Sequence, residues 1–218
     1  MRKKIGALVL SLLCLLTLPA GCGTQKTETE SGRLSVVATD FPAYDFARAV
    51  CGDLADVTLL LPPGAESHSY EPTPQDILKI QECDLFLYVG GESDAWVDTI
   101  LDSLDRPVDT LRMVECVDLL EEETTEGMTG AETREPGGVT EYDEHVWTAP
   151  ANAARIVAAI GAKMEAVDPA DAAQLARNTE DYVNQITALD TDFRDFFAGV
   201  KNKTMVFGDR FPLRYFAE

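Results

Sequence analysis

The chain of 218 residues contains two histidines, and both lie in short polar segments. Carboxylates flank His68 and His145 in the sequence: Glu66, Glu71, Asp143 and Glu144. Imidazole nitrogens together with carboxylate oxygens are common ligands of divalent transition metals in proteins. A single loop histidine is more often exposed or structural, but two histidines in this context predict a metal site with His68 and His145 as ligands.

The four flanking carboxylates are candidates for supporting the site. A carboxylate can accept a hydrogen bond from the imidazole nitrogen that faces away from the metal, and this fixes the tautomer of the ring. We expect this role for a minority of the four and a solvated position for the others.

The first 21 residues have the features of a secretory signal. A basic stretch at residues 2–4 precedes an apolar run over residues 5–18. That run is shorter than the roughly 20 residues that a membrane-spanning helix needs. Small residues directly before Cys22 resemble a bacterial lipobox. We therefore predict that Cys22 is lipidated and begins the mature protein; an ordinary cleaved signal is the alternative.

The segment after Cys22 and the overall charge suggest how the protein is held and what it attracts. Residues 22–33 are small and polar, which predicts a flexible tether. An acyl chain would hold the protein to the extracytoplasmic face of a cell membrane without spanning it. The net charge is −20, from 38 acidic and 18 basic residues. This charge argues against nucleic acid as a partner and favours the attraction of cations.

Residues 118–144 differ in composition from the rest of the chain. They are rich in glutamate, threonine and glycine and contain few apolar residues. We interpret them as a mobile acidic loop. Because the loop leads into His145, it could help to collect cations; a linker without a binding role is the alternative.

Three cysteines remain after the signal and the lipidated position: Cys51, Cys83 and Cys116. Their odd number and wide spacing fit neither a zinc ribbon nor a disulfide scaffold. We expect them to be buried as small apolar residues. One disulfide bridge is the alternative.

Hydrophobic patterning predicts an α/β fold with a parallel sheet. Strands are expected over residues 34–39, 57–61, 85–89 and 108–113. Helices are expected between them, up to residue 52, over 74–82 and over 95–104, and then over 151–167 and 169–198. The strand at 85–89 lacks alternation, as expected for a parallel strand buried on both faces. A further strand is expected at 204–207.

This order of elements gives His68 a suitable position for binding. Ligands of open α/β sheets collect at the carboxyl ends of the strands, and His68 follows the second strand. Four polar residues after the first and third strands should open onto the same edge and are further possible supporting groups: Asp40, Tyr44, Glu92 and Asp94. Helix capping and solvation are the alternatives for each of them.

The order of several segments along the chain resembles that of a known family. The segment 64–74 with His68, the strand ending in Gly90-Gly91, the acidic loop, the His-Val-Trp-Thr-Ala-Pro segment at 145–150 and the long helix follow one another. In this order they resemble the zinc and manganese substrate-binding lipoproteins of bacterial ABC transporters, which are similar to ZnuA.

The resemblance implies a two-lobed C-clamp of parallel-sheet α/β lobes joined by a long rigid helix. Residues 34–150 would form the metal-binding lobe and 151–199 the helices, including the linking helix. Residues 200–218 would begin a second lobe that is truncated here. The family's first lobe supplies two histidines, which match His68 and His145. Its second lobe supplies a further ligand, for which Asp209 is the nearest candidate.

The resemblance also implies the function: capture of a divalent metal ion and its delivery to a membrane permease. Zinc is the first choice because nitrogen ligands favour it over manganese, which is the alternative. No sequence motif of a metallohydrolase is present, so we do not expect an enzyme. A metal-dependent hydrolase and a surface adhesin lipoprotein are the alternatives from other classes.

Overall fold

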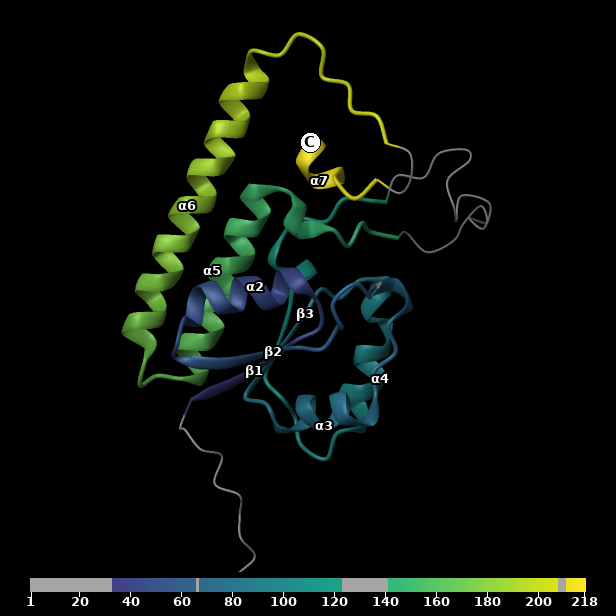
Figure 1. Cartoon of the computed structure of the whole chain (residues 1–218), viewed down its shortest axis with the longest axis vertical. Helices are drawn as coiled ribbons and strands as arrows, with labels where there is room; N and C mark the ends of the chain where they lie inside the picture. Colours follow the sequence, from purple (N-terminus) through teal and green to yellow (C-terminus); the bar gives the residue numbers. More distant parts are fainter. Residues whose placement is uncertain (1–32, 66, 123–140, 208–210) are drawn as a thin grey trace, which may run out of the picture. The chain divides into compact units, whose positions relative to one another are not determined.

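The computed structural model describes residues 33–65, 67–122, 141–207 and 211–218 (Figure 1). The predicted signal and tether, Glu66, most of the acidic loop and Asp209 lie outside these residues. What the sequence predicts for them, including lipidation of Cys22, remains a prediction.

A four-stranded parallel sheet forms the centre of the described fold. Its strands are β1 (Leu34–Ala38), β2 (Ala55–Leu59), β3 (Leu85–Tyr88) and β4 (Thr110–Arg112). The strand order is β2-β1-β3-β4, and every pair is parallel. This confirms the α/β fold with a parallel sheet that the sequence predicts.

Helices cover both faces of this sheet. They are α2 (Phe41–Cys51), α3 (Pro74–Glu82), α4 (Ala95–Ser103), α5 (Pro150–Val167) and α6 (Ala172–Ala198). Val36 and Leu87 point into one hydrophobic cluster with α2, α5 and α6, whereas Val37 and Phe86 point into a second with α3 and α4. Figure 1 shows these two groups of helices on opposite sides of the strands. Because side chains alternate along a strand, β1 and β3 are buried on both faces.

Local capping signals fix where the helices nearest the site begin. The Asp40 carboxylate, directly after β1, accepts a hydrogen bond of 3.3 Å from the Ala43 amide and caps α2. Thr73 and Asp76 form a capping box that starts α3, and Pro150 occupies the first turn of α5. These caps hold the loops at the carboxyl ends of the strands.

The long helix α6 contains 27 residues. At 1.5 Å per residue it extends roughly 40 Å. It packs closely on α5, where Gly161 leaves room for the side chain of Thr179. None of the helices in the described part of the chain combines the length and the apolar character needed to cross a membrane.

The strand predicted at residues 204–207 is wrong. The structure gives this segment no regular secondary structure, and Val206 is 90% exposed. A strand needs hydrogen bonds from a neighbouring strand, and the four strands of the described residues form a single sheet that does not include this segment.

The short helix α7 (Arg214–Ala217) packs back against the helices that cover the sheet. Phe216 packs edge-on against Phe193 of α6, with ring centroids 5.1 Å apart. The buried Tyr215 donates a hydrogen bond of 2.7 Å to the Asp143 carbonyl and accepts one from the Leu120 amide. These contacts anchor the segment that precedes His145.

Candidate metal centre

The two predicted histidines lie together beyond the carboxyl ends of the strands. His68 is on the short helix η1 (Ser67–Ser69) that follows β2, and His145 directly precedes η5 (Val146–Thr148). A cavity of about 250 Å³ opens between these segments. Its polar lining includes Asp40, Ser67, Ser93, Asp94, Glu144 and His145. The position agrees with the general location of ligand sites in open α/β sheets.

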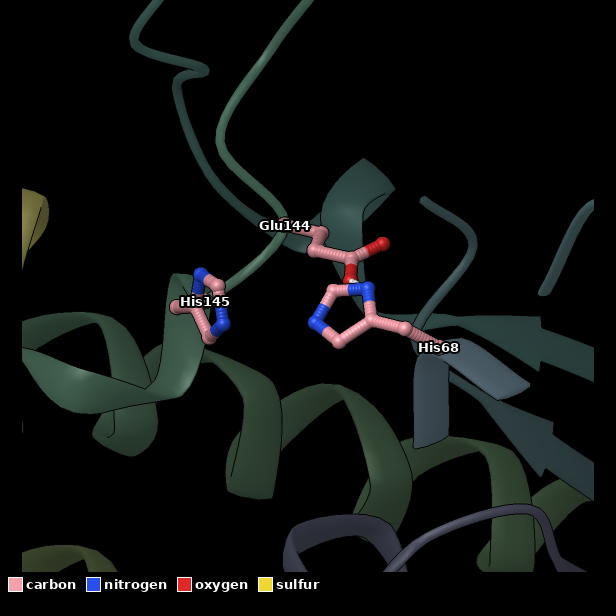
Figure 2. A group of neighbouring side chains, drawn as sticks. All are labelled: His68, Glu144 and His145. Carbon is pink, nitrogen blue, oxygen red and sulfur yellow. Dashed lines mark ion pairs between the residues drawn. The ribbon is translucent and has the colours of Figure 1, made fainter. Parts of the chain in front are cut away.

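His68, Glu144 and His145 form a cluster with the composition of a transition-metal site. One possible ligand atom of each residue lies within 4.8 Å of those of the other two. Figure 2 shows the two imidazoles facing each other across an open space, with the Glu144 carboxylate beside His68. Their ring centroids are 6.1 Å apart. Small side-chain rotations would therefore allow one metal ion to contact both rings.

Asp143 fixes the orientation of His145. Its Oδ1 atom lies 3.0 Å from Nδ1 of His145 and accepts a second hydrogen bond of 2.8 Å from the His145 backbone amide. The hydrogen bond to Asp143 raises the pKa of the His145 imidazole above its ordinary value. With Nδ1 engaged, Nε2 is the nitrogen that remains for a metal. The ring of Trp147 lies beside the imidazole, with centroids 5.6 Å apart.

His68 has a different pair of neighbours. Its Nδ1 atom lies 3.2 Å from the Ser93 hydroxyl and 3.5 Å from Oε1 of Glu144. Ser93 also donates hydrogen bonds to Glu144, from its hydroxyl to Oε1 and from its amide to Oε2 at 3.1 Å. Glu144 is thereby held against the loop that follows β3.

Gly91 makes this close approach possible. A Cβ atom at position 91 would overlap the Glu144 side chain, including its Cβ atom. A larger residue at position 91 would therefore force the Glu144 backbone to move. The Gly90-Gly91 motif in the sequence thus has a steric reason at its second glycine.

The other carboxylates named from the sequence divide into buried and exposed groups. Asp94 is buried and accepts hydrogen bonds from the amides of Val89 and Gly90, at 2.8 and 3.0 Å. Burial raises the pKa of Asp40 to about 7, with a further contribution from the charges of Asp94 and Glu144.

Glu71 and Glu92 are exposed and lie outside the cluster. Tyr44 packs against the hydrophobic core and under the Arg48 guanidinium instead of facing the site.

Ser93 is the residue of the site that the sequence analysis missed. It lies between Glu92 and Asp94, in a loop whose position the sequence predicts, but a serine carries no metal-binding signal of its own. Its proximity to His68 and Glu144 depends on contacts between residues 25 and 51 positions apart. The one signal in the sequence was the presence of a hydroxyl residue directly after the strand that became β3.

The three cysteines that follow the predicted signal and tether, Cys51, Cys83 and Cys116, are free in the structure. Cys51 and Cys83 are buried and Cys116 is partly buried. Burial raises the pKa of the Cys83 thiol to about 12, which is consistent with its role as a small core residue.

Comparison with known proteins shows relatives along almost the whole chain. The zinc-binding lipoprotein AdcA of Streptococcus pneumoniae serotype 4 is 36% identical over 208 residues, which cover 94% of this chain and 40% of the relative. The high-affinity zinc uptake system protein ZnuA of Bacillus subtilis is 31% identical over 202 residues, 89% of this chain and 62% of the relative. The chain therefore spans less than two thirds of the length of these relatives.

Solved structures give the same result. The Zn(II)-bound AdcA of Streptococcus pneumoniae has a TM-score of 0.70 and 31% identity, over 85% of this chain and 37% of that structure. The metal-dependent lipoprotein YcdH of Bacillus subtilis has a TM-score of 0.72 and 29% identity, over 85% of this chain and 63% of that structure. Residues 36–218 also match the family described as "Zinc-uptake complex component A periplasmic". The chain belongs to this ZnuA family, as its sequence motifs predict.

Proposed function

We propose that this protein binds a divalent metal ion outside the cytoplasm, most favourably zinc, and delivers it to the permease of an ABC transporter. The observation that carries the proposal is the clustering of His68 and His145 with the buried Glu144 carboxylate, within 4.8 Å of one another. The family assignment and the zinc-binding relatives support it.

The chemistry of the ligands supports zinc over manganese. Two imidazole nitrogens dominate the described cluster, and nitrogen ligands bind zinc more tightly than manganese. Asp209, from the beginning of the second lobe, is proposed as a further ligand. Such a carboxylate would add an oxygen to the coordination shell, which is compatible with both metals.

The position of the protein in the cell is part of the proposal. Residues 1–21 would be removed, Cys22 lipidated, and residues 22–33 would tether the metal-binding lobe to the outer face of the membrane. We propose a binding role and no enzymatic activity, in line with a family of uptake components.

Replacing His68 by alanine is expected to weaken zinc binding by about 100-fold or more, because one of the two nitrogen ligands is lost. The measurement is a competition titration of the metal-free protein against a chromogenic zinc chelator, repeated with manganese. Glu71→Gln is the matched control, since Glu71 is exposed and outside the cluster. Equal zinc affinity in the wild type and His68→Ala would contradict the proposed function.

Zinc binding should also depend on pH through His145. The imidazole binds zinc in its neutral form, and its hydrogen bond to Asp143 raises its pKa above the ordinary value. As the pH falls, protonation of His145 therefore begins to compete with zinc at a higher pH than at an unperturbed histidine. Above the raised pKa the competition disappears.

The variant Asp143→Asn tests this dependence. It replaces the carboxylate whose hydrogen bond and charge raise the pKa of His145, so the acidic limit of zinc binding should move to lower pH. At neutral pH the zinc affinity should still decrease by about 10-fold, because the ring is less well oriented. Affinity titrations across a pH series measure both effects; an unchanged profile would show that His145 does not limit binding.

A further inference from the structure

We infer that Ser93 is a positioning residue, which links the imidazole of His68 to the carboxylate of Glu144 and so directs Nε2 of His68 towards the metal. The inference rests on the proposed function, because it concerns the same site. It gives Ser93 a role, and it assigns Glu144 to orienting His68 and not to binding the metal directly.

The direction of the hydrogen bonds follows from the chemistry of the three groups. A carboxylate accepts hydrogen bonds, so the Ser93 hydroxyl donates its proton to Oε1 of Glu144. The hydroxyl has one proton, and towards Nδ1 of His68, at 3.2 Å, it must therefore accept. Nδ1 of His68 then carries the hydrogen, and the lone pair that can bind a metal lies on Nε2.

Two further contacts make the Ser93 and Glu144 pair rigid. The Ser93 amide donates to the second carboxylate oxygen of Glu144 at 3.1 Å, so both oxygens are held by one residue. Gly91 leaves the space that the Glu144 side chain fills. Glu144 is buried, with 8% of the residue exposed. The rigid pair therefore holds the His68 ring in one orientation.

The same arrangement is present at the other histidine, with one fewer residue. Asp143 contacts Nδ1 of His145 at 3.0 Å, whereas Glu144 lies 3.5 Å from Nδ1 of His68 and is also linked to it through the Ser93 hydroxyl. Both rings then keep Nε2 as the nitrogen free for a metal, as carboxylates that hold the other ring nitrogen do for metal-binding histidines. Two consecutive residues thus orient two histidines that come from separate loops.

The test uses the full chain and reads the tautomer of His68 as well as zinc affinity. Long-range correlation of imidazole protons with ¹⁵N distinguishes Nδ1–H from Nε2–H rings at alkaline pH, where imidazoles are neutral. The chain has two histidines, so His68→Ala and His145→Ala assign the signals. The wild-type protein without metal should show His68 as the Nδ1–H form.

In Ser93→Ala, His68 should become a mixture of tautomers, and zinc affinity should fall by about 10-fold. The tautomer of His145 should not change. Glu144→Gln leaves one acceptor oxygen for two Ser93 donors, so it should cause a similar loss, and the double variant should be no weaker than the weaker single variant. Ser103→Ala, an exposed serine remote from the site, is the matched control. Thermal unfolding confirms that each variant is folded.

Two results would overturn the inference. One is an unchanged tautomer and affinity in Ser93→Ala. The other is a much larger loss in Glu144→Gln than in Ser93→Ala with the tautomer of His68 unaltered, because Glu144 would then bind the metal itself. His68→Ala separates these outcomes from a failure of the proposed function: if it retains full zinc affinity, the site itself is wrong.

Discussion

Replacing Gly91 by alanine is expected to reduce zinc affinity by about 100-fold or more while the protein remains folded. The new Cβ atom of residue 91 would overlap several atoms of the Glu144 side chain, including the Cβ atom of Glu144, which is one bond from the backbone. A side-chain rotation cannot relieve this overlap, so the peptide that carries Glu144 and His145 must move. The change would disturb both ligand histidines, since Glu144 supports His68 and His145 is its neighbour in the chain.

The backbone of Gly91 does not itself prevent the substitution. Its φ of −98° lies in the range that any residue adopts, so the expected loss is steric and local. Overpacking of this kind costs about 1–3 kcal/mol of folding free energy. Gly199→Ala, at the end of α6, is the matched control because its new Cβ atom would meet only an ordinary contact. Zinc affinity within a factor of about two of the wild type in Gly91→Ala would refute this description of the site.

Replacing Phe86 by alanine should lower the free energy of unfolding by about 3–5 kcal/mol. Phe86 lies in β3 and is fully buried between the sheet and helices α3 and α4. It also stacks on Tyr88, with ring centroids 5.4 Å apart. Total stabilities of domains are about 5–15 kcal/mol, so this single change would remove a large part of the stability.

Urea denaturation of the metal-free protein measures this effect as a lower midpoint with an unchanged slope. Phe196→Ala is the matched control, because Phe196 lies on α6 and is 66% exposed. That variant should change the unfolding free energy by less than about 1 kcal/mol. Similar effects of the two substitutions would mean that Phe86 is not in the core.

The elements that the sequence predicts correctly are those with local signals. The helix expected at residues 74–82 has these bounds in the structure because Thr73, Pro74 and Asp76 specify its start within a few residues. The strand over 85–89 is recognised by its unbroken apolar run, which also predicts its burial on both faces. The strand expected at 204–207 fails for the opposite reason: its local composition is suitable, but a strand also requires a partner.

The candidate site could likewise be predicted only in part from the sequence. His68 and His145 could be predicted to share a site, since each is in a polar loop and His68 follows a parallel strand, at the carboxyl edge of the sheet. The different tasks of Asp143 and Glu144 could not, because adjacent side chains leave the backbone in different directions. Ser93 could not be predicted either, because its role depends only on which groups the fold places beside its hydroxyl.

The contacts that define the site join residues far apart in the sequence, such as Ser93 and Glu144, which are 51 positions apart. The unfolded chain therefore has no such site, and under the proposed function zinc binds the native state alone. By mass action, free zinc at 100 times its dissociation constant would add about 2.7 kcal/mol to the stability of the lobe. Resistance to proteolysis at the cell surface would then depend on how much zinc is available outside the cell.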